Sequence, residues 1–128
     1  MSDEAELLKL MERFRLAYAS QNRDELMATT DEGFVWQQHF ANDDSELPSG
    51  KAVEGVSGLL AVLQWRSEHW TNVRYRDLEE RTAGDMLVQT FTISGEEDGK
   101  PFHAKAVDLY RLRNGRIATK ETYWKQMK

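Results

Sequence analysis

Apolar side chains recur every three or four positions in two parts of the chain, a spacing that places them on one face of a helix. The first stripe consists of Leu7, Met11, Phe14 and Tyr18. The second stripe consists of Val56, Leu59, Leu60 and Leu63. These stripes predict helices over residues 4–20 and 55–66. Between them, Asn22 and Glu25 have the spacing of a capping box, which predicts a short helix from Asn22 to about Thr29.

From Gly33 onward, the side-chain pattern repeats at every second residue, which predicts a strand over residues 33–40. Four further segments with strand character are separated by turn-forming residues. They cover residues 72–82, 86–94, 101–113 and 116–125. Three helices and a long series of strands form an α+β pattern, so we expect residues 1–128 to fold as one domain with helices on one face of a curved antiparallel sheet.

The longest segment without either period covers residues 41–50 and is rich in turn-forming residues. Loops of this length inside compact domains often contribute to function. We therefore expect this loop to form a rim or a lid.

The turn at Asn114 and Gly115 allows two strand registers. A two-residue turn places Glu121 opposite Asp108. A three-residue loop with Gly115 in a bulge places Lys120 there instead. Both registers agree with the sequence, and they give Asp108 different partners.

Composition narrows the range of functions. Asp and Glu number 22 against 17 Lys and Arg, so the net charge of −5 disfavours binding to nucleic acid. The chain has no cysteine, which excludes disulfides and thiol chemistry. The acidic N-terminus is unlike a secretory signal, and no segment is apolar enough to cross a membrane. We expect a cytoplasmic protein without membrane association.

The layout of helices and strands resembles the nuclear-transport-factor-2-like superfamily, and within it the SnoaL-like and ketosteroid-isomerase-like proteins. The strongest match is residues 107–117, VDLYRLRNGRI, supported by Gly33 to Trp36 on the first strand. The resemblance covers nearly the whole chain. It implies a cystatin-like cone, in which a strongly curved antiparallel sheet wraps the first helix and encloses an apolar pocket. Isomerases, cyclases, dehydratases and binding proteins share this scaffold, so the fold alone does not select a function.

At the positions that the resemblance marks as catalytic, this chain departs from the pattern. Ketosteroid isomerases have an aspartate that acts as the general base, a tyrosine that donates to the oxyanion, and a protonated aspartic acid. At these positions this chain has Gln38, Phe14 and Asp108. Glutamine is not a base and phenylalanine has no hydroxyl, so steroid isomerisation is disfavoured. The positions matching the charged residues of limonene epoxide hydrolases hold Phe91, Ile93 and Thr122. Many SnoaL-like cyclases have His-Trp-Asp on the last strand, where this chain has Lys120, Glu121 and Thr122.

Asp108 and Lys120 are the candidate catalytic residues. Asp108 lies between apolar neighbours on its strand, and desolvation of a carboxyl favours the neutral acid. If Lys120 pairs with it, the carboxylate stays ionised instead. The pair then either transfers protons or anchors a polar group, or it is a structural ion pair between two strands.

Aromatic and neutral polar residues on the predicted inner faces are candidates for binding an apolar ligand. They are Phe14, Tyr18, Trp36, Gln38, Phe91, Tyr110, Thr122 and Trp124. The same residues could equally fill a collapsed core. Two functions of different class therefore remain open. One is a small-molecule binding domain. The other is a cofactor-independent isomerase, cyclase or dehydratase that uses Asp108 with Lys120.

Metals, cofactors and partners are the remaining expectations. His39, His69 and His103 have no metal-binding spacing, so we expect neither a metal nor a cofactor. The outer faces of the long strands carry the apolar residues Val107, Leu109 and Tyr123. Such a face suggests a homodimer formed through the outer side of the sheet.

Overall fold

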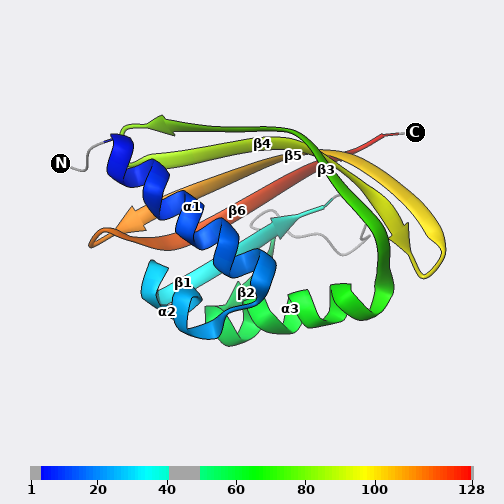
Figure 1. Cartoon of the computed structure of the whole chain (residues 1–128), viewed down its shortest axis with the longest axis horizontal. Helices are drawn as coiled ribbons and strands as arrows, with labels where there is room; N and C mark the ends of the chain where they lie inside the picture. Colours follow the sequence, from blue (N-terminus) through cyan, green and yellow to red (C-terminus); the bar gives the residue numbers. More distant parts are fainter. Residues whose placement is uncertain (1–3, 41–49, 128) are drawn as a thin grey trace.

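The computed structural model describes residues 4–40 and 50–127, which form three helices and a six-stranded sheet (Figure 1). The helices are α1 (Glu4–Ser20), α2 (Arg23–Thr29) and α3 (Gly55–His69). The strands are β1 (Thr30–His39), β2 (Lys51–Glu54), β3 (Trp70–Ala83), β4 (Met86–Glu97), β5 (Lys100–Arg113) and β6 (Arg116–Gln126). The predicted α+β class is confirmed. The loop predicted at 41–50 lies outside the described residues except for Gly50.

The strand order is β2-β1-β6-β5-β4-β3. The prediction of a wholly antiparallel sheet is wrong, because β1 pairs with β6 in the parallel direction while the other pairs are antiparallel. Figure 1 shows long strands that bend without curling strongly, so the predicted cone around α1 is not confirmed. Sequence analysis also missed β2, which has four residues and buries only Val53, too few for a readable alternation.

The helix boundaries follow the predicted signals closely. The Asn22 side chain accepts a hydrogen bond from the backbone N–H of Glu25 at 3.2 Å, which caps α2. The carboxylate of Glu25 is paired with Arg13 instead. The third helix is longer than predicted and ends at His69, because its last turn, which includes Arg66, continues beyond the apolar stripe.

The hairpin between β5 and β6 has a two-residue turn followed by a β-bulge. Asn114 and Gly115 have φ values of 55° and 73°, as a type I′ turn requires, and Arg113 pairs with Arg116. The register then shifts, because Ala118 has no partner in the ladder. This extra residue moves every later pair on β6 by one position.

Both registers considered for Asp108 are therefore wrong. Asp108 lies opposite Thr122, rather than opposite Glu121 or Lys120. Lys120 lies opposite Tyr110. The bulge places Lys120 and Thr122 on the same face of the sheet as Asp108, where all three are buried.

The helices cover the inner face of this sheet. The α1 stripe of Leu7, Met11 and Phe14 is buried against it. On the outer face, Val107 and Tyr123 are exposed, and dimerisation through that face stays a prediction. Within residues 4–40 and 50–127, the helices are too short or too polar to qualify as a membrane span.

Candidate functional site

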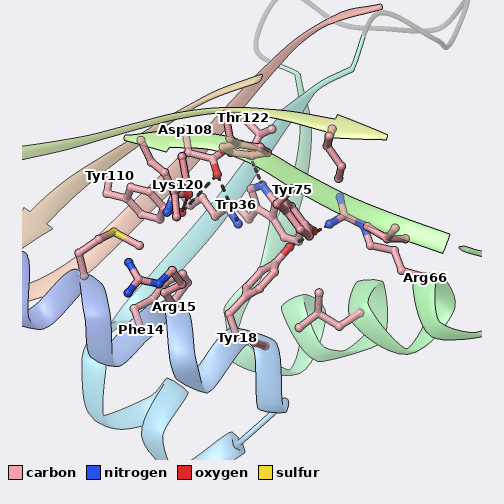
Figure 2. Close-up of a pocket in the computed structure, with 18 of the residues that line it drawn as sticks. Phe14, Arg15, Tyr18, Trp36, Arg66, Tyr75, Asp108, Tyr110, Lys120 and Thr122 are labelled. Atoms are coloured by element: carbon pink, nitrogen blue, oxygen red, sulfur yellow. Dashed lines mark hydrogen bonds and ion pairs between the residues drawn. The ribbon is translucent and has the colours of Figure 1, made fainter. Parts of the chain in front are cut away.

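A cavity of about 510 Å³ lies between α1, α3 and the inner face of the sheet (Figure 2). All but one of the predicted ligand-binding residues line it. They are Phe14, Tyr18, Trp36, Phe91, Tyr110, Thr122 and Trp124. The two candidate catalytic residues, Asp108 and Lys120, line the same cavity. Strand alternation and the α1 stripe together therefore bring these side chains into one place.

The exception is Gln38, which lines a neighbouring cavity of about 620 Å³ instead. Gln38 follows Trp36 by two residues on β1, a distance of about 7 Å. Arg66, Trp70 and Trp124 line both cavities and so lie between them. The side-chain amide nitrogen of Gln38 is buried without a hydrogen-bond partner.

Asp108 is held by hydroxyl donors from its own strand and the next one. The Thr122 hydroxyl donates to Oδ1 of Asp108 at 2.6 Å. The Trp36 indole N–H donates to the same hydroxyl at 2.9 Å, and an indole can only donate. Thr122 must therefore use its single hydrogen toward Asp108. The hydroxyl of Tyr110 lies 3.3 Å from Oδ2. Oδ1 of Asp108 is therefore a hydrogen-bond acceptor.

Lys120 is buried beside this carboxylate without a hydrogen bond to it. Its Nζ lies 4.0 Å from Oδ2 of Asp108, and its side chain is 5% exposed. Nζ also lies 4.0 Å from the ring centre of Tyr18 and 4.3 Å from that of Trp36, positions that favour the cation. Figure 2 shows Lys120 between Tyr110 and Trp36, above the helix that carries Phe14.

Burial lowers the pKa of Lys120 to about 8, because an ammonium loses hydration inside the protein. The charge of Asp108 opposes this shift, and the positive charge of Arg66 adds to it. Both the ammonium and the free amine are therefore populated near pH 8. A lysine in this state can act as an acid or as a base.

A second chain of contacts leads from Tyr110 to the edge of the cavity. The Tyr110 hydroxyl lies 3.3 Å from the side-chain oxygen of Gln89, and the Gln89 amide donates to Glu80 at 3.0 Å. Glu80 also forms an ion pair with Arg15. Burial and the nearby Asp108 raise the pKa of Tyr110 well above its usual value, so its hydroxyl remains a donor.

Six further polar residues of this cavity were not predicted from the sequence: Arg15, Gln21, Arg66, Ser67, Tyr75 and Gln89. A signal existed for Arg66, which lies three positions after Leu63 and continues the helical stripe. Tyr75 had no usable signal, because the β3–β4 register shifts on both sides of it and breaks the alternation. Its side chain is 53% exposed, so it forms part of the rim.

Metal-ligating side chains are not clustered in residues 4–40 and 50–127. No group of three or more His, Asp or Glu residues there could hold an ion, and no histidine lines the cavity. The functional groups of the cavity include the amine of Lys120, the carboxylate of Asp108, the guanidinium groups of Arg15 and Arg66, and tyrosine hydroxyls.

Comparison with known proteins gives one family. The model of the SnoaL-like domain matches residues 11–120. No curated protein matches the chain.

Solved structures share the fold. An NTF2-like protein from Burkholderia xenovorans is 19% identical, with a TM-score of 0.81 over 96% of this chain and 92% of its own. A candidate SnoaL-like polyketide cyclase from a Jannaschia species is 19% identical, with a TM-score of 0.72 over 97% and 91%. A hypothetical protein of ketosteroid isomerase-like fold from Catenulispora acidiphila, solved with trimethylamine, is 17% identical, with a TM-score of 0.67 over 89% and 83%.

Proposed function

This chain belongs to the SnoaL-like domain family, and from that membership we propose that its cavity binds a small, mainly apolar molecule. The observation that carries the proposal is the cavity of about 510 Å³ with aromatic walls. Small-molecule sites have volumes of roughly 300–1,000 Å³ and a few polar groups among apolar ones. We take this cavity to be the pocket that the family's fold encloses.

The departures from the family's catalytic pattern support binding over steroid isomerisation. Phe14 lines the cavity but has no hydroxyl, and Gln38 lies on the neighbouring cavity. Thr122 is already engaged by Asp108 and Trp36. The walls of the cavity are mainly aromatic and aliphatic, which suits a flat, mainly apolar molecule.

Naphthamide, a neutral and flat aromatic probe, tests the proposal. We expect it to bind the wild-type protein in isothermal titration calorimetry, and the Phe91→Gln variant to bind it about tenfold more weakly. Phe91 lines the cavity, and burying an aromatic side chain against a ligand contributes on the order of the 1.4 kcal/mol that a tenfold change requires.

Leu16→Gln is the matched control, because Leu16 lies on α1, is 60% exposed and does not line the cavity. This variant should bind naphthamide as the wild type does. Absence of binding to the wild type, or equal binding by the Phe91→Gln variant, would contradict the proposed site.

A second candidate function is proton transfer on the bound molecule, as in a cofactor-independent isomerase, cyclase or dehydratase. The observation that favours it is the Lys120 amine, with its pKa lowered to about 8, beside a fixed carboxylate in the cavity. The free amine would take a proton from a carbon of the ligand, and Asp108 would stabilise the ammonium that forms. Some structural relatives are candidate polyketide cyclases, which fits this class of chemistry.

A further inference from the structure

The cavity holds more positive than negative charge. Its charged lining residues are Arg15, Arg66, Lys120 and Asp108. Arg15 is paired with Glu80, and Lys120 lies 4.0 Å from Asp108. For Arg66, no carboxylate of residues 4–40 and 50–127 lies within 4.0 Å. Among the residues that the structure describes, the charge of Arg66 therefore has no carboxylate to pair with.

Aromatic contacts hold the Arg66 guanidinium in position. Its central carbon lies 4.2 Å from the ring centre of Trp70 and 5.2 Å from that of Trp36. Its Nη1 donates to the Tyr18 hydroxyl at 2.9 Å. Figure 2 shows the side chain extending from α3 toward Tyr18 and Tyr75, at the edge of the cavity. Contacts of this kind orient a guanidinium without neutralising it.

Most of the donors of Arg66 remain available. A guanidinium has five N–H groups in a planar fork, and one hydrogen bond to a phenol uses one of them. Arg66 is only half-buried, so a charged group beside it keeps some of its hydration. The carboxylate of Glu97 accepts the indole N–H of Trp70 at 2.8 Å.

We propose that the ligand of this cavity is an apolar carboxylate, whose carboxylate binds Arg66 and whose apolar body extends toward Phe91 and Ile93. The inference rests on the proposed function, because it names the ligand class of the same cavity. A carboxylate matches the planar fork of an arginine with two parallel hydrogen bonds. Lys120 is the less suitable anchor, since Asp108 already balances its charge.

A carboxylate bound to Arg66 also affects the ionisation of Lys120. The charge of Arg66 contributes to the lowered pKa of Lys120. A bound carboxylate offsets that charge and moves the pKa of Lys120 upward. The ligand's acidic group therefore influences the amine without touching it.

Calorimetry with three naphthalene probes tests the ligand class. The probes are naphthoate, neutral naphthamide and naphthylmethylammonium. We expect naphthoate to bind the wild type at least about tenfold more tightly than naphthamide, as a charge-assisted bond to arginine would give. The Arg66→Gln variant should lose this preference and still bind naphthamide. Arg66→Lys should retain part of it, because the charge remains while the fork is lost.

Arg13→Gln is the control, because Arg13 is an exposed arginine of α1 that does not line the cavity. It should leave the preference for naphthoate unchanged. Naphthamide binding as tightly as naphthoate, tighter binding of the ammonium probe, or a preference that survives in Arg66→Gln would each overturn the inference while leaving the proposed function intact. Failure of every probe to bind would instead contradict the proposed function.

Discussion

Replacing Asp108 by asparagine should lower the free energy of unfolding by about 3 kcal/mol at pH 6. The substitution removes the carboxylate that lies 4.0 Å from the Lys120 ammonium, and both side chains are about 95% buried. Breaking a buried ion pair from one side leaves the other charge uncompensated, at a cost of roughly 3–5 kcal/mol. Asparagine keeps the shape and still accepts the Thr122 hydrogen bond, so the lower end of that range applies.

The loss of stability caused by Asp108→Asn should become smaller as the pH rises. Asp108 raises the pKa of Lys120, so its loss moves that pKa below about 8. Between the two pKa values, the folded wild type binds more protons than the folded variant. The difference in the free energy of unfolding between the wild type and the variant therefore decreases as the pH rises through this interval toward 8. Urea unfolding of both proteins at pH 6 and pH 9 measures the difference.

Glu25→Gln provides the comparison, because it breaks the exposed pair with Arg13. We expect a much smaller loss of stability there, without dependence on pH between 6 and 9. A loss for Asp108→Asn that is the same at both pH values would show that Asp108 and Lys120 are not electrostatically coupled.

The Lys120→Met variant should lose most of the protein's capacity to remove a proton from an apolar carbon acid. Nitrobenzisoxazole is a suitable probe, since one base-driven step opens its ring. The amine takes the proton from the ring carbon, the C–H electrons form the nitrile, and the N–O bond breaks to release a coloured phenolate. General-base catalysis contributes typically 10²–10⁴-fold, so we expect a loss of at least about 100-fold.

The pH profile identifies the base. The wild-type rate should rise with a midpoint near pH 8, where the Lys120 amine becomes deprotonated. Lys125→Met is the matched control, because Lys125 is exposed on the same strand and does not line the cavity. It should keep both the rate and the midpoint. A Lys120→Met rate equal to that of the wild type would exclude Lys120 as the base and leave the cavity as a binding site.

Regular periodicity made most of this architecture predictable. The stripe from Leu7 to Tyr18 placed α1 within residues 4–20, and strand alternation correctly grouped Asp108 with Tyr110 on the inner face. The partner of Asp108 was not predictable, because it depends on the bulge at Ala118. Ile117 and Ala118 are both apolar and fit either face, so nothing local marks the extra residue.

Contacts that join distant parts of the chain were also beyond sequence reasoning. The parallel pairing of β1 with β6 brings Trp36 next to Lys120 and within reach of Thr122, although the residues are far apart in sequence. The position of Arg66 follows from how α3 packs over these strands. An arginine on a helical stripe is compatible with a solvated face, and only the packing shows that it enters the cavity.

The most direct test is the titration of Lys120 by NMR, with and without saturating naphthamide. The Lys120→Met variant assigns the signal. We expect a midpoint near pH 8 in the free protein and a lower one with naphthamide, because a neutral ligand in the cavity removes water from the ammonium. A Lys120 signal and midpoint that remain unchanged at saturating naphthamide would show that the cavity beside Asp108 and Lys120 is not the binding site.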